Sequence, residues 1–140
     1  MNAISLVTYH YSANAGAVMQ TYALCRFLKE HGFKIQVVDI RHFEPTLKTI
    51  SEGSPLPVRL LKSIIFPRRI KKIMSQYYPA MTKHYKSMDD LRKNPPKSDC
   101  YIVGSDQVWN PDISADRALA YFLDFGSDEV RRISYASSFG

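Results

Sequence analysis

The residues best suited to bind a polar ligand follow a short apolar run late in the chain. The run, residues 101–103, is followed by Gly104, Ser105 and Asp106. Gly104 permits a close approach to the backbone, the Ser105 hydroxyl can donate and accept hydrogen bonds, and the Asp106 carboxylate can bind a sugar hydroxyl or act as a base. A Ser/Asp turn that caps the following segment explains the same residues equally well. The sequence leaves both interpretations open at this position.

Small polar residues also follow two other apolar segments. Ser12, Asn14 and Gly16 come after the first of them, and Ser137 and Ser138 come at the end of the last. Backbone N–H groups at the start of a helix here can hold a phosphate or a carboxylate. The chain lacks the G-x-G-x-x-G and Walker patterns, however. Simple capping of the helix is therefore the favoured interpretation for the first segment.

The apolar spacing predicts the elements that carry these residues. Residues 3–9 and 34–40 are rich in β-branched and aromatic side chains, which is typical of buried strands. Between them, apolar residues recur with helical spacing up to Leu28, and Gly32 stands where a left-handed C-terminal cap belongs. A strand, a helix and a second strand within about forty residues form a βαβ unit, whose strands are parallel.

The rest of the chain extends this pattern. The later predicted elements are a long loop at 41–60, a helical segment at 59–78 that is broken at Pro67, a short helix at 87–93, strands at 98–104 and 131–137, and a small edge piece at 120–125. We therefore expect an α/β fold, a Rossmann-like parallel sheet with flanking helices, as one domain over 1–140 with an irregular insertion at about 41–97. In such sheets ligands bind outside the carboxyl ends of the strands. A final parallel strand without a helix after it is left uncovered on one face, so we also expect further chain or a partner chain to cover it.

Composition and charge limit the class of protein. Hydrophobic residues make up 45% and charged residues 23% of the chain, no apolar run reaches the length of a membrane span, and the N-terminus does not resemble a signal peptide. We expect a cytoplasmic protein. The net charge of +6 favours anionic partners without choosing among them. Cys25, Cys100 and the four histidines have no metal-ligand spacing, so no metal site is predicted.

A basic segment at 59–73 alternates Lys and Arg with apolar residues. Contact with an anionic membrane surface is one interpretation of it. A core helix with a solvated basic face is the favoured one. Nucleic-acid binding requires aromatic residues among the basic ones, and the aromatic residues here lie mainly in the predicted strands and on helix faces, so no nucleic-acid partner is expected.

Four segments together resemble a known family. "SANAGAVMQTYALCRFLKEHGFKIQVVDIR", "YIVGSDQVWNP", "YFLDFG" and "RRISYASSFG" occur in this order and resemble the N-terminal part of the polysaccharide pyruvyl transferases. The pair "GSDQVWN" and "ISYASSFG" is the specific part of the resemblance. The chain departs from the family pattern at Ala15, where the family usually has an aromatic residue.

The resemblance implies one half of a two-domain, GT-B-type fold with the active site between the halves. It implies transfer of a pyruvyl group from phosphoenolpyruvate to sugar hydroxyls of a cell-surface or capsular polysaccharide, with no cofactor and with an acceptor that is free or lipid-linked at the inner face of the membrane. In the family, the groups that bind phosphoenolpyruvate lie mainly in the C-terminal half of the protein. The catalytic residues of this chain are therefore left unassigned. The residues expected to line the acceptor side are Asn14, Gly16, Gln20, Gly104, Ser105, Asp106, Ser137 and Ser138.

Two other functions stay open on the sequence. One is a glycosyltransferase half-domain that binds a nucleotide sugar, which the same two-domain architecture supports. The other is a non-catalytic binding or assembly module whose basic face docks to a partner or to a membrane. The donor that the protein accepts separates the first of these from a pyruvyl transferase.

Overall fold

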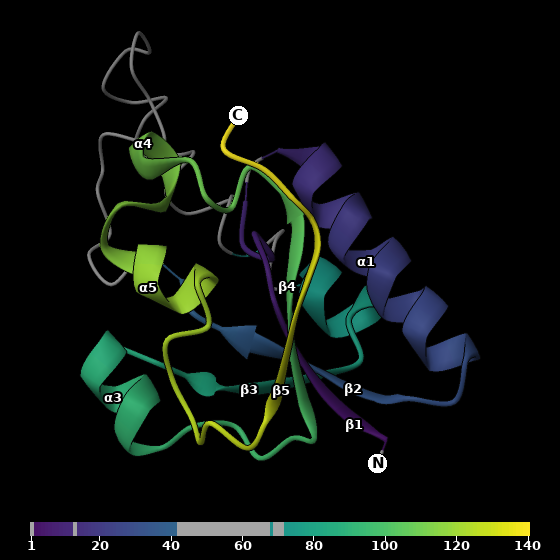
Figure 1. Cartoon of the computed structure of the whole chain (residues 1–140). Helices are drawn as coiled ribbons and strands as arrows, with labels where there is room; N and C mark the ends of the chain where they lie inside the picture. The colour runs from purple at the N-terminus through teal and green to yellow at the C-terminus, as the bar shows by residue number, and fades with distance from the viewer. Residues whose placement is uncertain (1, 13, 42–67, 69–71) are drawn as a thin grey trace, which may run out of the picture.

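A parallel sheet forms the centre of the computed structural model, which describes residues 2–12, 14–41, 68 and 72–140 (Figure 1). Among these residues five strands pair in the order β3-β2-β1-β4-β5, all parallel. The strands are β1 (Ala3–Val7), β2 (Lys34–Asp39), β3 (Ala80–His84), β4 (Cys100–Asp106) and β5 (Arg131–Ser137). The predicted α/β, Rossmann-like fold class is confirmed.

Helices cover both faces of the sheet. On one face α1 (Ala15–Glu30) lies beside the helical residues 72–77, and Tyr22 and Tyr77 meet edge to face. The other face carries α3 (Met88–Lys93), α4 (Pro111–Ser114), the short 3₁₀ helix η2 (Ala115–Arg117) and α5 (Ala118–Tyr121), as Figure 1 shows. Because β1 leads to β2 on one side and β4 lies on its other side, the crossovers step in opposite directions and cover opposite faces.

The start of α1 follows from its capping residue. The Asn14 side chain accepts a hydrogen bond from the Gly16 backbone N–H at 2.8 Å, as expected for an N-cap. The helix then buries the predicted apolar face, Ala17, Val18, Thr21, Cys25 and Leu28. Gly32 follows the helix with a φ of 85°, so the left-handed position predicted for it is confirmed.

The apolar side chains pack into two clusters, one on each face. On the α1 face Leu6, Ile35, Val37 and Ile102 of the sheet pack against α1 and against Met74. On the other face Val7, Val38, Tyr101 and Val103 pack against Leu91, Tyr121 and Phe125. Both sets come from strands that are buried on two sides, which is why these strands are continuously apolar.

Two predictions about elements differ from the structure. The sequence predicts no strand at Ala80–His84, but β3 forms there at the edge of the sheet, where its exposed and half-buried side chains give no buried-strand signal. The edge piece predicted at 120–125 is wrong, because Ala120 and Tyr121 end α5 and Leu123 has a left-handed φ of 59°, which is not a strand conformation. The predictions for 42–67 and 69–71 lie outside the described residues.

Strand β5 has an open face. Ile133 is 40% exposed and Tyr135 is 56% exposed, as expected for a parallel strand without a covering helix. An open cavity of about 260 Å³ lies beside it, lined by residues that include Ile4, Leu28 and Ile102. This cavity lies at the amino ends of the strands and not at their carboxyl ends. In the described part of the chain, no helix has the length and apolar character needed to cross a membrane.

Gly104 gives a stability prediction. Its φ is 142°, and a Cβ at this position would lie 1.8 Å from the backbone oxygen of Tyr135 on β5. Gly104→Ala therefore combines backbone strain with a clash between the new Cβ and the β5 backbone, and we expect a loss of about 3 kcal/mol or more in the free energy of unfolding. Urea unfolding measures this loss.

Gly32→Ala is the matched control, because Gly32 also has a positive φ but a Cβ there meets no atom within 4 Å. We expect a loss of only about 1 kcal/mol from the backbone conformation alone. Equal losses in the two variants would show that the approach of β5 to Gly104 does not constrain this position.

Candidate functional site

Thr8 joins two of the predicted site residues at the carboxyl edge of the sheet. The Gln20 side-chain amide donates to the Thr8 hydroxyl at 2.8 Å, and that hydroxyl donates to the backbone oxygen of Ser105 at 3.4 Å. Gln20 comes from the second turn of α1, Thr8 follows β1, and Ser105 lies near the end of β4. The structure thus brings Gln20 and Ser105 together through a residue that the sequence did not single out.

Asn14 and Gly16 lie at the same edge, where they cap α1. The Gly16 N–H donates to the Asn14 side-chain oxygen, and the Asn14 N–H donates to the Ser12 hydroxyl at 3.0 Å. Both N–H groups therefore have partners within the chain. The capping interpretation that the sequence favoured is the one that the geometry shows, and a binding role for these two residues stays a prediction.

The ends of β4 and β5 are hydrogen-bonded to each other. The Ser138 N–H donates to the backbone oxygen of Asp106 at 3.1 Å, and the Ser137 hydroxyl donates to the backbone oxygen of Val103 at 3.4 Å. The backbone approach that Gly104 permits is thus to β5. Asp106 has a φ of 100°, and its carboxylate accepts from the Gln107 N–H at 2.8 Å. These contacts form the turn that one of the two interpretations predicted. Asp106 and its neighbour Ser105 are both half-buried.

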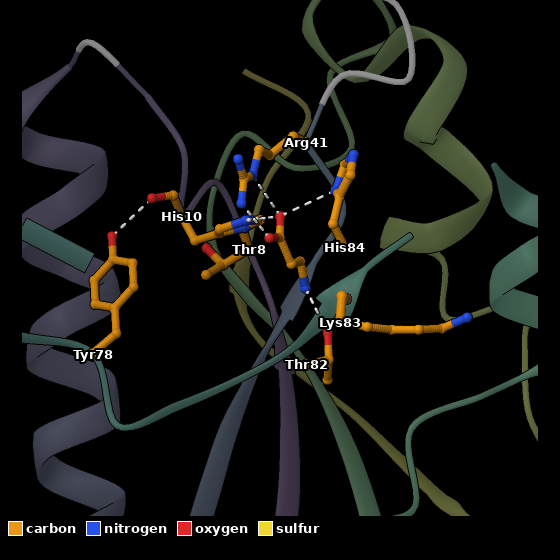
Figure 2. A network of polar contacts seen from close by, with 8 residues as sticks. Thr8, His10, Arg41, Tyr78, Thr82, Lys83 and His84 are labelled. Carbon is orange, nitrogen blue, oxygen red and sulfur yellow. Dashed lines mark hydrogen bonds and ion pairs between the residues drawn. The ribbon is translucent and has the colours of Figure 1, made fainter. Parts of the chain in front are cut away.

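A second polar cluster, which the sequence did not predict, surrounds the carboxylate of Asp39 at the end of β2 (Figure 2). Arg41 donates from Nε to Oδ1 at 2.9 Å and from Nη2 to Oδ2 at 2.6 Å. His10, which follows β1, places Nε2 at 3.2 Å from Oδ1, and His84, the last residue of β3, places Nδ1 at 3.4 Å from the same oxygen. We call Asp39, Arg41, His10 and His84 the Asp39 cluster.

The two halves of this cluster differ in exposure. The side chains of Asp39 and His10 are 5% and 2% exposed, whereas those of Arg41 and His84 are 41% and 38% exposed. Burial alone would raise the pKa of Asp39, but the hydrogen bonds and charges of His10 and Arg41 outweigh it and hold that pKa well below its usual range. Asp39 is therefore an anion in the folded protein at neutral pH.

His10 is fixed from three sides. Its Nδ1 lies 3.1 Å from the backbone oxygen of Thr8, and its Nε2 faces Asp39. Its own backbone oxygen accepts from the Tyr78 hydroxyl at 2.9 Å. These contacts hold the segment that leaves β1 in place over the sheet, in the position from which α1 begins.

The signals for the Asp39 cluster were present in the sequence. "VVDIR" ends a buried strand with an acidic residue and then a basic one, and "TYHY" ends the strand beside it with a histidine. From the sequence, the histidines were considered only as metal ligands and not as partners of a buried carboxylate. Within the described residues no group of three or more His, Cys, Asp or Glu side chains is arranged to hold a metal ion.

Comparison with known families decides the identity of the chain. The family model described as polysaccharide pyruvyl transferase matches residues 14–140. The chain belongs to the polysaccharide pyruvyl transferase family. The resemblance predicted from the motifs is confirmed, and the family name describes transferases that act on polysaccharides. No curated protein and no solved structure matches the chain. Asp39, Arg41 and His84 lie within the matched range, as do all the predicted site residues.

The pKa of Asp39 gives a prediction for this pyruvyl transferase family member. Because that pKa is lower in the folded chain than the value of about 3.9 in an unfolded one, the ionised carboxylate stabilises the fold above about pH 4, and this contribution is lost as the pH falls below it. Asp39→Asn removes the contribution and leaves the cations without their anion. We expect the variant to be less stable by about 3 kcal/mol at pH 7, and the difference to shrink towards pH 3.

Urea unfolding at pH 7, 5, 4 and 3 measures this difference. Asp89→Asn is the control, because Asp89 is exposed in the first turn of α3. Parallel stability profiles of the wild type and Asp39→Asn over this range would contradict the prediction.

Proposed function

We propose that the protein transfers a pyruvyl group from phosphoenolpyruvate to sugar hydroxyls of a cell-surface or capsular polysaccharide. The observation that carries the proposal is membership of the polysaccharide pyruvyl transferase family over residues 14–140. In this proposal the chain forms the N-terminal, Rossmann-like half of a GT-B-type enzyme. The reaction takes place in the cytoplasm, on an acceptor at the inner face of the membrane.

The chemistry requires three kinds of group. Protonation of the enol methylene makes the adjacent carbon electrophilic, a sugar hydroxyl adds to that carbon, phosphate leaves, and a second hydroxyl closes the ketal. A general acid, a base and cationic groups for the phosphate and carboxylate are needed. The ends of parallel strands are the usual place for such groups in an α/β sheet.

We assign the acceptor to the part of this edge formed by β4, β5 and the first turns of α1. Asp106 and Ser105 are half-buried there, and Ser105 is tied to Gln20 through Thr8. A carboxylate and hydroxyls can bind sugar hydroxyls by accepting and donating hydrogen bonds. Asp106 binds an acceptor hydroxyl in this assignment, and Asn14, Gly16, Gly104, Ser137 and Ser138 shape the wall around it.

The donor substrate that the protein accepts distinguishes the possible functions. The complete protein, incubated with an acceptor glycan, is expected to release phosphate from phosphoenolpyruvate only when the glycan is present. Nucleotide sugars in place of phosphoenolpyruvate should give no product. Turnover of a nucleotide sugar would instead support a glycosyltransferase, and binding of the glycan without turnover of either donor would support a non-catalytic module.

Asp106→Asn in the complete protein tests the acceptor assignment. Asparagine tolerates a positive φ and keeps an oxygen for the Gln107 N–H, so the turn is expected to survive. Loss of one charged hydrogen bond to a sugar hydroxyl should raise the acceptor KM roughly tenfold or more. The phosphoenolpyruvate KM should change little.

Asp112→Asn is the matched control, because Asp112 is an exposed carboxylate a few residues away in α4. Acceptor kinetics that are unchanged in Asp106→Asn and equal to those of the control would remove Asp106 from the acceptor site.

A further inference from the structure

The Asp39 cluster lies where a ligand of a parallel sheet is expected, but on a different part of the edge from the proposed acceptor wall. Its side chains lie at the carboxyl ends of β1, β2 and β3, whereas Asp106, Ser137 and Ser138 lie at the ends of β4 and β5. The question is whether the cluster only joins strand ends or also binds something. Its charges and its exposure decide this.

Three nitrogen-bearing side chains surround the single carboxylate. Both ring nitrogens of His10 face oxygens that can only accept, the Thr8 carbonyl and the Asp39 carboxylate. His10 thus contacts the Asp39 carboxylate from the buried side, and the permanently charged Arg41 contacts it from the exposed side.

Arg41 is held in one orientation, and its side chain is partly exposed. Two of its N–H groups point at Asp39, and its guanidinium carbon lies 5.0 Å from the centre of the Tyr11 ring. A guanidinium has five N–H groups, so the contact with Asp39 leaves others for a ligand. The side chain is 41% exposed. A planar, oriented guanidinium suits two oxygens of a phosphate or a carboxylate.

His84 adds a second donor beside it in the ring forms that carry a proton on Nε2, because Nδ1 is the nitrogen that faces Asp39. Its Nδ1 is 3.4 Å from Asp39, and 38% of its side chain is exposed. The neighbouring Lys83 is directed elsewhere, because its Nζ pairs with Asp90 on α3 at 2.7 Å, and Figure 2 shows it pointing away from Arg41 and His84. Arg41 and His84 are thus the exposed members of the cluster, and Asp39 and His10 are the buried ones behind them.

We propose that Arg41 and His84 bind an anionic phosphate or carboxylate group at the carboxyl ends of β2 and β3, with Asp39 and His10 as the positioning residues. The proposal rests on the proposed function only for the identity of the ligand, since phosphoenolpyruvate carries both groups. On that basis this chain supplies a cationic contact to the donor, in addition to those expected from the family's second half.

Isothermal titration calorimetry of the complete protein at constant ionic strength tests the proposal with three probes: inorganic phosphate, pyruvate and phosphoenolpyruvate. Arg41→Gln is expected to weaken binding of the preferred probe by about tenfold or more, and His84→Gln by a smaller factor. Phosphate binding that depends on Arg41 identifies a phosphate site, and pyruvate binding that depends on Arg41 identifies a carboxylate site.

Arg26→Gln is the matched control, because Arg26 also pairs with a carboxylate, Glu30, but lies on the exposed face of α1. It should bind all three probes like the wild type. If Arg41→Gln does not fold, Arg41→Lys keeps a positive charge beside Asp39 and loses the planar fork, and it should still weaken binding. Far-ultraviolet circular dichroism and the unfolding midpoint show which variants are folded.

Wild-type affinity for every probe in a folded Arg41→Gln or Arg41→Lys variant would overturn the proposal, as would a wild-type protein that binds none of the probes. The proposed function fails separately. If the protein binds phosphate through Arg41 but turns over no phosphoenolpyruvate, the anion site stands and the proposed pyruvyl transfer is excluded. If the protein turns over phosphoenolpyruvate and Arg41→Gln leaves the KM for it unchanged, the proposed function stands and the anion site at Arg41 is excluded.

Discussion

The structure depends on the parallel pairing of β1 with β2 on one side and with β4 on the other. Parallel neighbours require the chain to cross the sheet after each strand, and the two directions of crossing place α1 and α3 on opposite faces. The apolar side chains are thereby buried in two layers, and the described strands all end at one edge. Polar residues far apart in the sequence meet at that edge because the strands that carry them are parallel.

Two groups of polar contacts fix the strand ends, and they differ in how they are stabilised. At β4 and β5 the contacts are mostly between backbone groups, and Gly104 is needed because Tyr135 lies against it. At β1, β2 and β3 the contacts converge on one buried carboxylate, Asp39. A buried charge is costly unless it is fully paired, so the segments that carry His10 and Arg41 are tied to the fold. The same pairing orients Arg41 at the surface.

Local features were predictable and distant contacts were not. The Asn14 cap, the Gly32 turn and β5 follow from residues adjacent in sequence, and the structure has them as predicted. The Asp39 cluster joins residues at the ends of three strands, from His10 to His84, and no spacing rule connects them. Strand β3 was missed for a related reason, since its place in the sheet comes from pairing with β2 and not from its own apolar pattern. The need for glycine at position 104 likewise comes from its pairing with Tyr135 on β5, which the sequence does not show.

We propose that this family member binds its substrates at the carboxyl edge of its sheet. Mapping of backbone amide chemical shifts in the complete protein during titration with phosphoenolpyruvate tests it most directly. We expect the shifted amides of this chain to lie just after β1, β2 and β3, around His10, Arg41 and His84. Shifts confined to the amino ends of the strands, around the apolar cavity beside Ile4 and Ile133, would show that phosphoenolpyruvate does not bind at the carboxyl edge.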